Sequence, residues 1–189
     1  MQVEEIHPDE QPVSIWRFVL DMLETVLLAL VLFLGINAVS ARVRVDGFSM
    51  RPTLQDGEYV LVNKLSYKID LPARGDIVVF RFPMDPTQDF IKRVIGLPGD
   101  QVAIASGRVS VNGNVLNEPY IAAAPMYEGS WQVPADHLFV LGDNRNDSSD
   151  SHSWGVVPFE NVVGKAILIY WPLADWSMID HVPVAAAAP

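Results

Sequence analysis

The chain has 189 residues, of which 50% are hydrophobic, and this is enough to bury one sizeable core. Its formal net charge of −10 argues against a nucleic-acid phosphate backbone as its main partner. Because the chain has no cysteine, it contains no disulfide framework, no thiolate zinc site and no cysteine nucleophile.

The first predicted element is an apolar helix over residues 18–39, which follows an acidic N-terminal segment. A helix of this length reaches about 33 Å and can span a bilayer, with Asp21 and Glu24 at the level of the lipid headgroups. No small-residue cleavage site follows it convincingly, which favours an uncleaved anchor over a cleaved signal peptide or a buried helix. We therefore expect a tail over residues 1–16, a transmembrane anchor over 17–40 and one further domain over 41–189.

Beyond residue 40 the pattern is that of β-strands, and no long amphipathic helix is predicted. Asn112-Gly113 predicts a two-residue hairpin turn, because both residues readily adopt positive φ angles. The predicted fold class is mainly β: an antiparallel sheet domain behind the helix. Strands are expected at residues 41–45, 58–63, 76–82, 90–95, 102–104, 108–111, 137–141 and 165–171.

One serine and one lysine in this β region suggest acyl-transfer chemistry. Ser49 lies in the run Gly-Phe-Ser-Met-Arg-Pro-Thr-Leu, and Lys92 follows 43 residues later in Phe-Ile-Lys-Arg-Val-Ile-Gly. A serine hydroxyl needs a neighbouring base to become a nucleophile, and an unprotonated lysine can serve as that base. On a strand, Lys92 shares its face with Phe90 and Val94, and burial among apolar groups lowers the pKa of a lysine.

The residues alone leave alternatives open. Lys92 could reach solvent from a half-buried strand, as most lysines do, and Lys64 could be the base instead. A Ser-His-Asp triad could also use Ser49, with its other members drawn from His137, His152, Asp143 and Asp150. No metal site is expected, because the four histidines lack the spacing of metal ligands.

Four blocks of the sequence resemble those of bacterial type I signal peptidases, the membrane-bound serine endopeptidases that remove signal peptides from exported proteins. The blocks are residues 47–54, 75–80, 91–100 and 141–155, and the resemblance extends over residues 17–172. It implies that Ser49 is the nucleophile and Lys92 the general base, acting through an acyl-enzyme without a cofactor or a metal. It also implies a variable β insertion at residues 101–134.

The resemblance further implies roles for residues around this pair. Ser148 would orient the lysine amine. Met50 either lies beneath the nucleophile and contacts the substrate or is a core residue. The polar run at residues 143–150 predicts a loop held by side-chain to backbone bonds and a charge pair. The expected nucleophile and oxyanion loop contains Gly47, Ser49, Met50 and Pro52, and the expected supporting residues are Asp143, Asn144, Arg145 and Asp150.

Two positions depart from the pattern of the family. Many members have a serine where this chain has Gly47, and the hydroxyl of that serine helps to bind the oxyanion. Many also have an arginine where this chain has His152, which makes the pairing with Asp150 sensitive to pH near the ordinary histidine pKa of about 6.5.

The resemblance implies that the substrates are secretory preproteins, cut after small residues of the Ala-X-Ala type and bound as an extended strand. Residues 77–82 are candidates for the pocket walls, and residues 82–84 and 171–179 for contact with the lipid bilayer. The translocation machinery is a further expected partner. The expected location is the cell membrane, with the N-terminus cytoplasmic and the catalytic domain outside, although arginines after the helix favour the reverse orientation.

Two other classes of function are compatible with parts of the sequence. A membrane-tethered β binding module without catalysis would keep the fold but would not need Ser49 and Lys92 together. A soluble self-cleaving repressor would share a Ser-Lys pair, but it should carry a helix-turn-helix segment and no anchor.

Overall fold

The structure is a computed structural model that describes residues 15–181. The chain divides into two compact units, residues 1–38 and 39–189. The first is dominated by helix α1 (Ile15–Val39), which is long and apolar enough to cross a membrane and has no buried residue. Its charged residues, Arg17, Asp21 and Glu24, all lie in the first half, and the second half is a nearly continuous apolar run.

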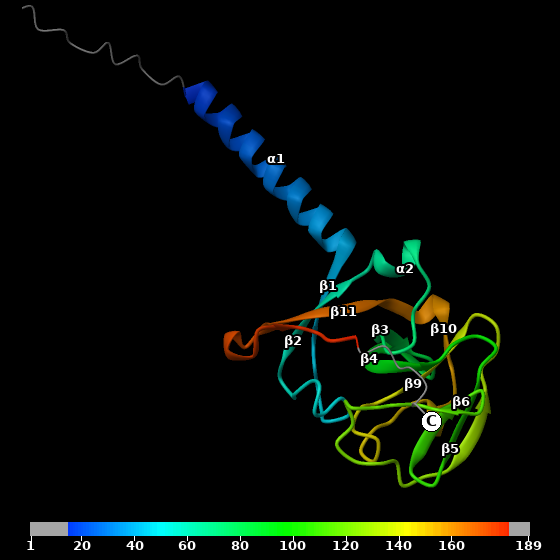
Figure 1. Cartoon of the computed structure of the whole chain (residues 1–189). Coiled ribbons are helices and arrows are strands. Elements are labelled where there is room, and N and C mark those ends of the chain that lie inside the picture. The colour runs from blue at the N-terminus through cyan, green and yellow to red at the C-terminus, as the bar shows by residue number, and fades with distance from the viewer. Residues whose placement is uncertain (1–14, 182–189) are drawn as a thin grey trace, which may run out of the picture. The chain divides into compact units, whose positions relative to one another are not determined.

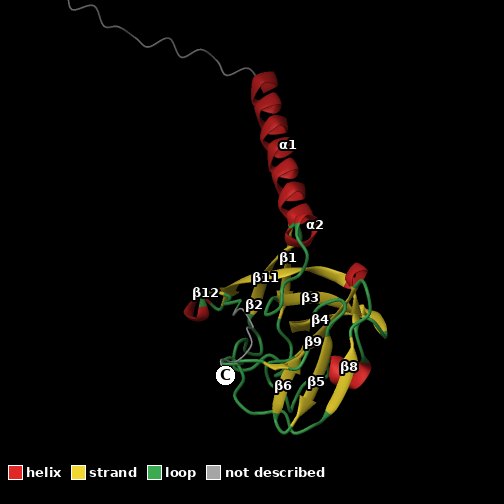
Figure 2. Ribbon diagram, turned by 45° about the vertical axis from the view of Figure 1, so that its right-hand side comes forward, coloured by secondary structure: helices red, strands yellow, loops and turns green. Residues whose placement is uncertain are grey.

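The second unit is built of two antiparallel sheets (Figures 1 and 2). The larger sheet has eight strands in the order β1-β2-β11-β3-β4-β9-β10, with β12 paired to β11. The smaller sheet has the order β7-β6-β5-β8. The predicted fold class, an apolar helix followed by an antiparallel β domain, is confirmed. The strands of the larger sheet are β1 (Ser40–Arg44), β2 (Tyr59–Asn63), β3 (Ile77–Phe82), β4 (Asp85–Gly96), β9 (His137–Leu141), β10 (Val157–Pro158), β11 (Val162–Trp171) and β12 (Ser177–Met178).

The smaller sheet contains the predicted hairpin. Asn112 and Gly113 both have positive φ angles, of 53° and 81°, and connect two paired strands. The strands of this sheet are β5 (Gln101–Ala105), β6 (Arg108–Val111), β7 (Asn114–Val115) and β8 (Gly129–Gln132). Short helices complete the unit: α2 (Ser66–Ile69), α3 (Ser151–Trp154), η1 (Phe159–Asn161) and η2 (Leu173–Asp175).

Three short strands, β8, β10 and β12, were not predicted, because their few residues show no clear apolar alternation. Strand β4 begins at Asp85, five residues before the predicted start. Its polar first half has no apolar alternation and is held in the sheet by pairing with β3.

Three apolar clusters form the core, and strand β4 contributes to all of them. Phe90 and Val94 belong to the cluster around Phe80, whereas Ile91 and Ile95 each belong to a different cluster. The predicted alternation along this strand is therefore confirmed, with Lys92 on the face that Phe90 and Val94 share.

Candidate active site

Ser49 lies on a tight loop after β1, which we call the Ser49 loop (residues 47–54). Gly47 has a φ angle of +93°, which favours glycine, and its N–H donates to Asp56 Oδ1 at 2.8 Å. Met50 and Leu54 are fully buried and anchor the loop, and the N–H of Leu54 donates to the carbonyl of Met50 at 3.0 Å. Met50 is thus a core residue, the second of the two roles considered for it.

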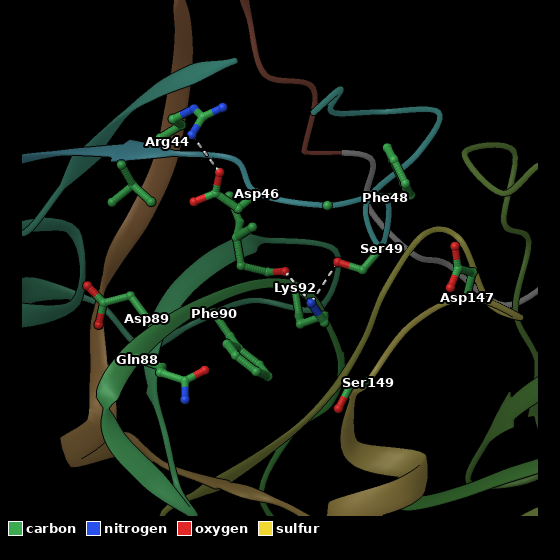
Figure 3. A pocket seen from close by; sticks show the side chains of 13 residues that line it. Arg44, Asp46, Phe48, Ser49, Gln88, Asp89, Phe90, Lys92, Asp147 and Ser149 are labelled. Carbon is green, nitrogen blue, oxygen red and sulfur yellow. Dashed lines mark hydrogen bonds and ion pairs between the residues drawn. The ribbon is translucent and has the colours of Figure 1, made fainter. Parts of the chain in front are cut away.

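Lys92 reaches this loop from β4 (Figure 3). Its Nζ lies 2.8 Å from Ser49 Oγ and donates to the carbonyl of Ile91 at 3.0 Å. The side chain does not snorkel to solvent, since the residue is only 4% exposed. Burial lowers its pKa to about 8, against the opposing charges of Asp150 and Asp143. At pH 7 about one tenth of Lys92 is therefore unprotonated and able to accept a proton from Ser49, a fraction far larger than for a lysine with the ordinary pKa near 10.5.

The Ser49 loop is also held by a second loop, which we call the polar loop (residues 142–150). Asn144 makes two bonds across to it: its N–H donates to the carbonyl of Ser49 at 3.0 Å, and its side-chain amide to that of Phe48 at 3.2 Å. Gly142 lies so close to Ser49 that a β-carbon would overlap the carbonyl oxygen of Ser49 and the hydroxyl of Ser148. The backbone at residue 142 therefore has to be glycine for the two loops to meet.

Asp143 is fully buried, and its partner lies outside the polar loop. Arg93 donates hydrogen bonds to both carboxylate oxygens of Asp143, from Nε to Oδ1 at 2.8 Å and from Nη2 to Oδ2 at 2.7 Å. Arg93 also donates to the carbonyl of Gly75 at 2.9 Å, and Thr53 donates its hydroxyl to Asp143. These four residues come from the four sequence blocks, so one buried ion pair fastens all the blocks together.

Arg145 likewise pairs with a distant residue. It is 1% exposed, and its guanidinium contacts Glu118 at 2.9 and 2.7 Å, from the segment between β7 and β8. The ring of Tyr120 lies beside it and also faces the guanidinium of Arg93, at 4.0 Å from the ring centre. The charge pair expected within the polar loop is therefore not formed, because Asp143 of the loop pairs with Arg93 of β4 and Arg145 of the loop pairs with Glu118.

Asp150 closes the polar loop. Its Oδ2 accepts the N–H of Gly142 at 2.9 Å, and its Oδ1 lies 2.6 Å from His152 Nδ1. The His152 ring also stacks on Tyr127, with ring centres 3.9 Å apart. His152 thus takes the position beside Asp150 and does not contact Ser49.

The remaining candidates are placed as follows. Ser148 Oγ is buried and has no hydrogen-bond partner among residues 15–181, so the expected bond to Lys92 is not formed. The Lys92 amine instead bonds to Ser49 Oγ and to the carbonyl of Ile91. Pro52 is exposed on the Ser49 loop. His137 bonds to the carbonyl of Ala135 at 2.7 Å, and neither this histidine nor His152 supports a triad with Ser49.

A cleft of about 640 Å³ opens in front of Ser49. Five consecutive residues of β4, Gln88 to Lys92, line it. Since successive side chains point to opposite faces of a strand, the cleft runs along the edge of β4. This edge is free because β9 pairs with β4 only from Arg93 onward. The other lining residues are Val43, Arg44, Asp46, Gly47, Phe48, Ser49, Asp147 and Ser149.

The apolar walls of the cleft differ from those expected. Residues 77–80 are fully buried in the sheet and do not line it. Its apolar side chains are instead Val43, Phe48, Phe90 and Ile91. Within residues 15–181, no group of three or more histidine and carboxylate side chains is arranged to hold a metal ion.

Sequence reasoning missed Arg93, Thr53, Glu118 and Tyr120 as parts of the site. Arg93 had a usable signal, because an arginine inside a buried apolar strand requires a counter-charge. For Glu118 and Tyr120 the sequence contains no comparable signal, since their partners are set by the packing of the second sheet.

Comparison with known proteins gives a consistent result. The profile of the family described as "Signal peptidase, peptidase S26" matches residues 17–171. The chain is similar to a "Probable signal peptidase I-2" of Synechocystis sp., with 44% identity over 173 residues, 87% of this chain and 78% of that protein. It is similar to a "Signal peptidase I" of Leptolyngbya laminosa, with 45% identity over 161 residues, 80% of this chain and 79% of that protein. A chloroplastic "Thylakoidal processing peptidase 1" of Arabidopsis thaliana is 37% identical over 147 residues, 72% of this chain and 43% of that protein.

Proposed function

The chain belongs to the signal peptidase family S26, and we propose that Ser49 is its nucleophile and Lys92 its general base. As a member of this family it has signal peptidase I activity: it is a serine endopeptidase that removes signal peptides from preproteins. The observation that carries the proposed roles is the 2.8 Å contact between Lys92 Nζ and Ser49 Oγ in a buried setting.

The proposed reaction follows from this contact. The neutral Lys92 amine takes the proton of Ser49 as Oγ attacks the scissile carbonyl carbon, and it then gives the proton to the leaving amine when the C–N bond breaks. A water molecule, deprotonated by the same amine, then attacks the acyl carbon; the bond from that carbon to Ser49 Oγ breaks, the carboxyl product leaves, and Lys92 returns the proton to Ser49 Oγ. The low pKa of Lys92 suits both directions of this proton transfer.

The oxyanion requires donors that are free in the resting protein. The N–H of Gly47 is engaged with Asp56, whereas that of Ser49 has no partner within residues 15–181. We therefore assign the Ser49 N–H as the oxyanion donor, with no side-chain donor at residue 47. A missing donor costs about 100- to 1000-fold elsewhere, so a second donor has to come from the loop or the substrate complex.

Preproteins are proposed to bind as an extended chain along the free edge of β4, opposite the outer edge of β1. The residues before the cut would then lie against Val43, Phe90 and Ile91, and we propose that these apolar walls select small side chains such as those of Ala-X-Ala. The exposed apolar residues of the C-terminal segment, Trp171, Leu173, Trp176 and Met178, are proposed to contact the bilayer surface.

Helix α1 is consistent with a membrane anchor. We further propose the arrangement expected from the sequence: a cytoplasmic tail over residues 1–16, the anchor over 17–40 and an extracytoplasmic catalytic domain over 41–189, including the insertion over 101–134. The translocation machinery remains a proposed partner. Digestion of the domain by protease added to sealed right-side-out vesicles would support this orientation, and full protection would overturn it.

The decisive experiment is cleavage of a preprotein with an Ala-X-Ala site by the detergent-solubilised full chain. Ser49→Ala and Lys92→Met should abolish cleavage, while Lys64→Met should retain it and exclude the alternative base. Cleavage by the Lys92→Met variant would refute the assignment of Lys92 as the general base. If neither the wild type nor any variant cleaves, the chain is a binding module without catalysis.

A further inference from the structure

The cleft beside Ser49 carries uncompensated negative charge at its two ends. Apart from Lys92, its ionisable lining residues are Arg44, Asp46, Asp89 and Asp147. Arg44 and Asp46 form an ion pair, with 3.1 Å between Nη1 and Oδ1. Within residues 15–181, the carboxylates of Asp89 and Asp147 have no ion-pair partner.

The two carboxylates lie on opposite sides of the Ser49–Lys92 pair. Figure 3 shows Asp89 beside Gln88 at the β4 end of the cleft, and Asp147 beyond Ser49, on the side of Phe48. If the residues before the cut run along the edge of β4, the chain after the cut has to leave past Phe48 and Asp147. Asp147 therefore faces the beginning of the mature protein.

We propose that Asp147 selects preproteins by charge, favouring basic over acidic side chains in the first residues after the cut. This inference rests on the proposed function, because it uses the direction of the bound chain. Asp147 belongs to the polar loop, and the bonds of Asn144 to the Ser49 loop hold it in position beside the nucleophile. The side chain of Asp147 is exposed, so it acts on a bound substrate through the electrostatic field that it creates.

One cation lies near the same end and opposes this effect. The guanidinium of Arg51 stacks on the ring of Phe48, 4.2 Å from the ring centre. Arg51 does not line the cleft, whereas Asp147 does. We therefore expect the carboxylate to dominate the field that a bound peptide meets.

The expected size of the effect follows from exposed ion pairs. One exposed contact changes an equilibrium by about 1.4- to 5-fold at ordinary ionic strength. Comparing lysine with glutamate at one substrate position adds an attraction to a repulsion, so their kcat/KM values should differ by about 2- to 25-fold. The difference should shrink in high salt, because the screening length falls from about 10 Å at 0.1 M to about 3 Å at 1 M.

The test uses three peptides with the same Ala-X-Ala site and with lysine, glutamine or glutamate at the second position after the cut. kcat/KM is measured for the full chain in a nonionic detergent at low and high salt. The wild type should prefer lysine over glutamate, and Asp147→Asn should bring the ratio close to one. Asp147→Lys should reverse it.

Two matched variants make the result specific. Asp89→Asn, at the other end of the cleft, and Asp136→Asn, on an exposed turn outside it, should both keep the wild-type ratio. A wild-type ratio of one, an unchanged ratio in Asp147→Asn, or a preference for glutamate set by Arg51 would overturn the proposal. Cleavage of the glutamine peptide tests the proposed function separately, since it requires Ser49 but not the charge of Asp147.

Discussion

Replacement of Gly142 by alanine tests how closely the two loops have to approach. The added methyl carbon would overlap the Ser49 carbonyl and the Ser148 hydroxyl. Hydrogen bonds restrain the backbone at both Gly142 and Ser49. The N–H of Gly142 donates to Asp150 at 2.9 Å, and the N–H of Asn144 holds the Ser49 carbonyl at 3.0 Å. Relief of the overlap therefore requires the backbone that carries Ser49 to move.

A displacement on the order of 1 Å is needed, and a misplacement of this size costs about 100-fold in rate. Overpacking also costs about 1–3 kcal/mol of stability. We expect Gly142→Ala to lower kcat for an Ala-X-Ala peptide about 100-fold with a smaller change in KM. Steady-state kinetics and thermal unfolding of the same detergent-solubilised sample measure both effects.

Gly164→Ala is the matched control, because its methyl carbon would overlap the backbone carbonyl of Asn63 in the sheet, away from Ser49. It should lose comparable stability and keep most of its kcat. The reasoning is refuted if Gly142→Ala keeps at least half of the wild-type kcat. It is equally refuted if both variants lose the same share of it.

Three further predictions follow from the buried charges. Since the pKa of Lys92 is lowered to about 8, log kcat/KM should fall with a slope of one as the pH drops below 8, and a profile that is flat from pH 8 to 6 would contradict the assignment of Lys92 as the base. In the unfolded chain Lys92 keeps its proton up to its ordinary pKa near 10.5, whereas in the folded chain it loses the proton above about pH 8. Between these two pH values the unfolded state binds more protons than the folded state, so the free energy of unfolding rises with pH. Lys92→Met should abolish this rise and unfold at a higher temperature than the wild type at pH 7. Glu118→Gln leaves the buried Arg145 without its counter-charge and should lower the free energy of unfolding, measured by chemical denaturation, by about 3–5 kcal/mol. The control Glu160→Gln, at an exposed position, should change it by no more than about 0.5 kcal/mol. Equal effects of the two variants would argue against the ion pair.

Patterns of short range were readable from the sequence, because each depends on neighbouring residues alone. The apolar run predicts the helix that the structure contains over Ile15–Val39. Alternation along β4 predicts that Lys92 faces the apolar side with Phe90 and Val94, and Asn112-Gly113 predicts the hairpin turn. Burial of the lysine and its lowered pKa follow from the same alternation.

Partners that lie far apart in the sequence could not be predicted in this way. The polar loop offers several acids and one arginine, and nothing local shows that Asp143 pairs with Arg93 or that Arg145 pairs with Glu118. Two further findings have the same origin: the Ser148 hydroxyl has no hydrogen-bond partner in the part of the chain that the structure describes, and the cleft walls lie at the edge of β4 instead of at residues 77–82.

The sequence by itself thus determined the class of chain, the order of its main elements and the serine and lysine that we propose for catalysis. Only the tertiary structure decided how those residues are held. The physical reason is that a buried charge takes its partner from whichever strand or loop packs against it. Likewise, a cleft forms where a strand edge is left unpaired, and both depend on the arrangement of the two sheets in space.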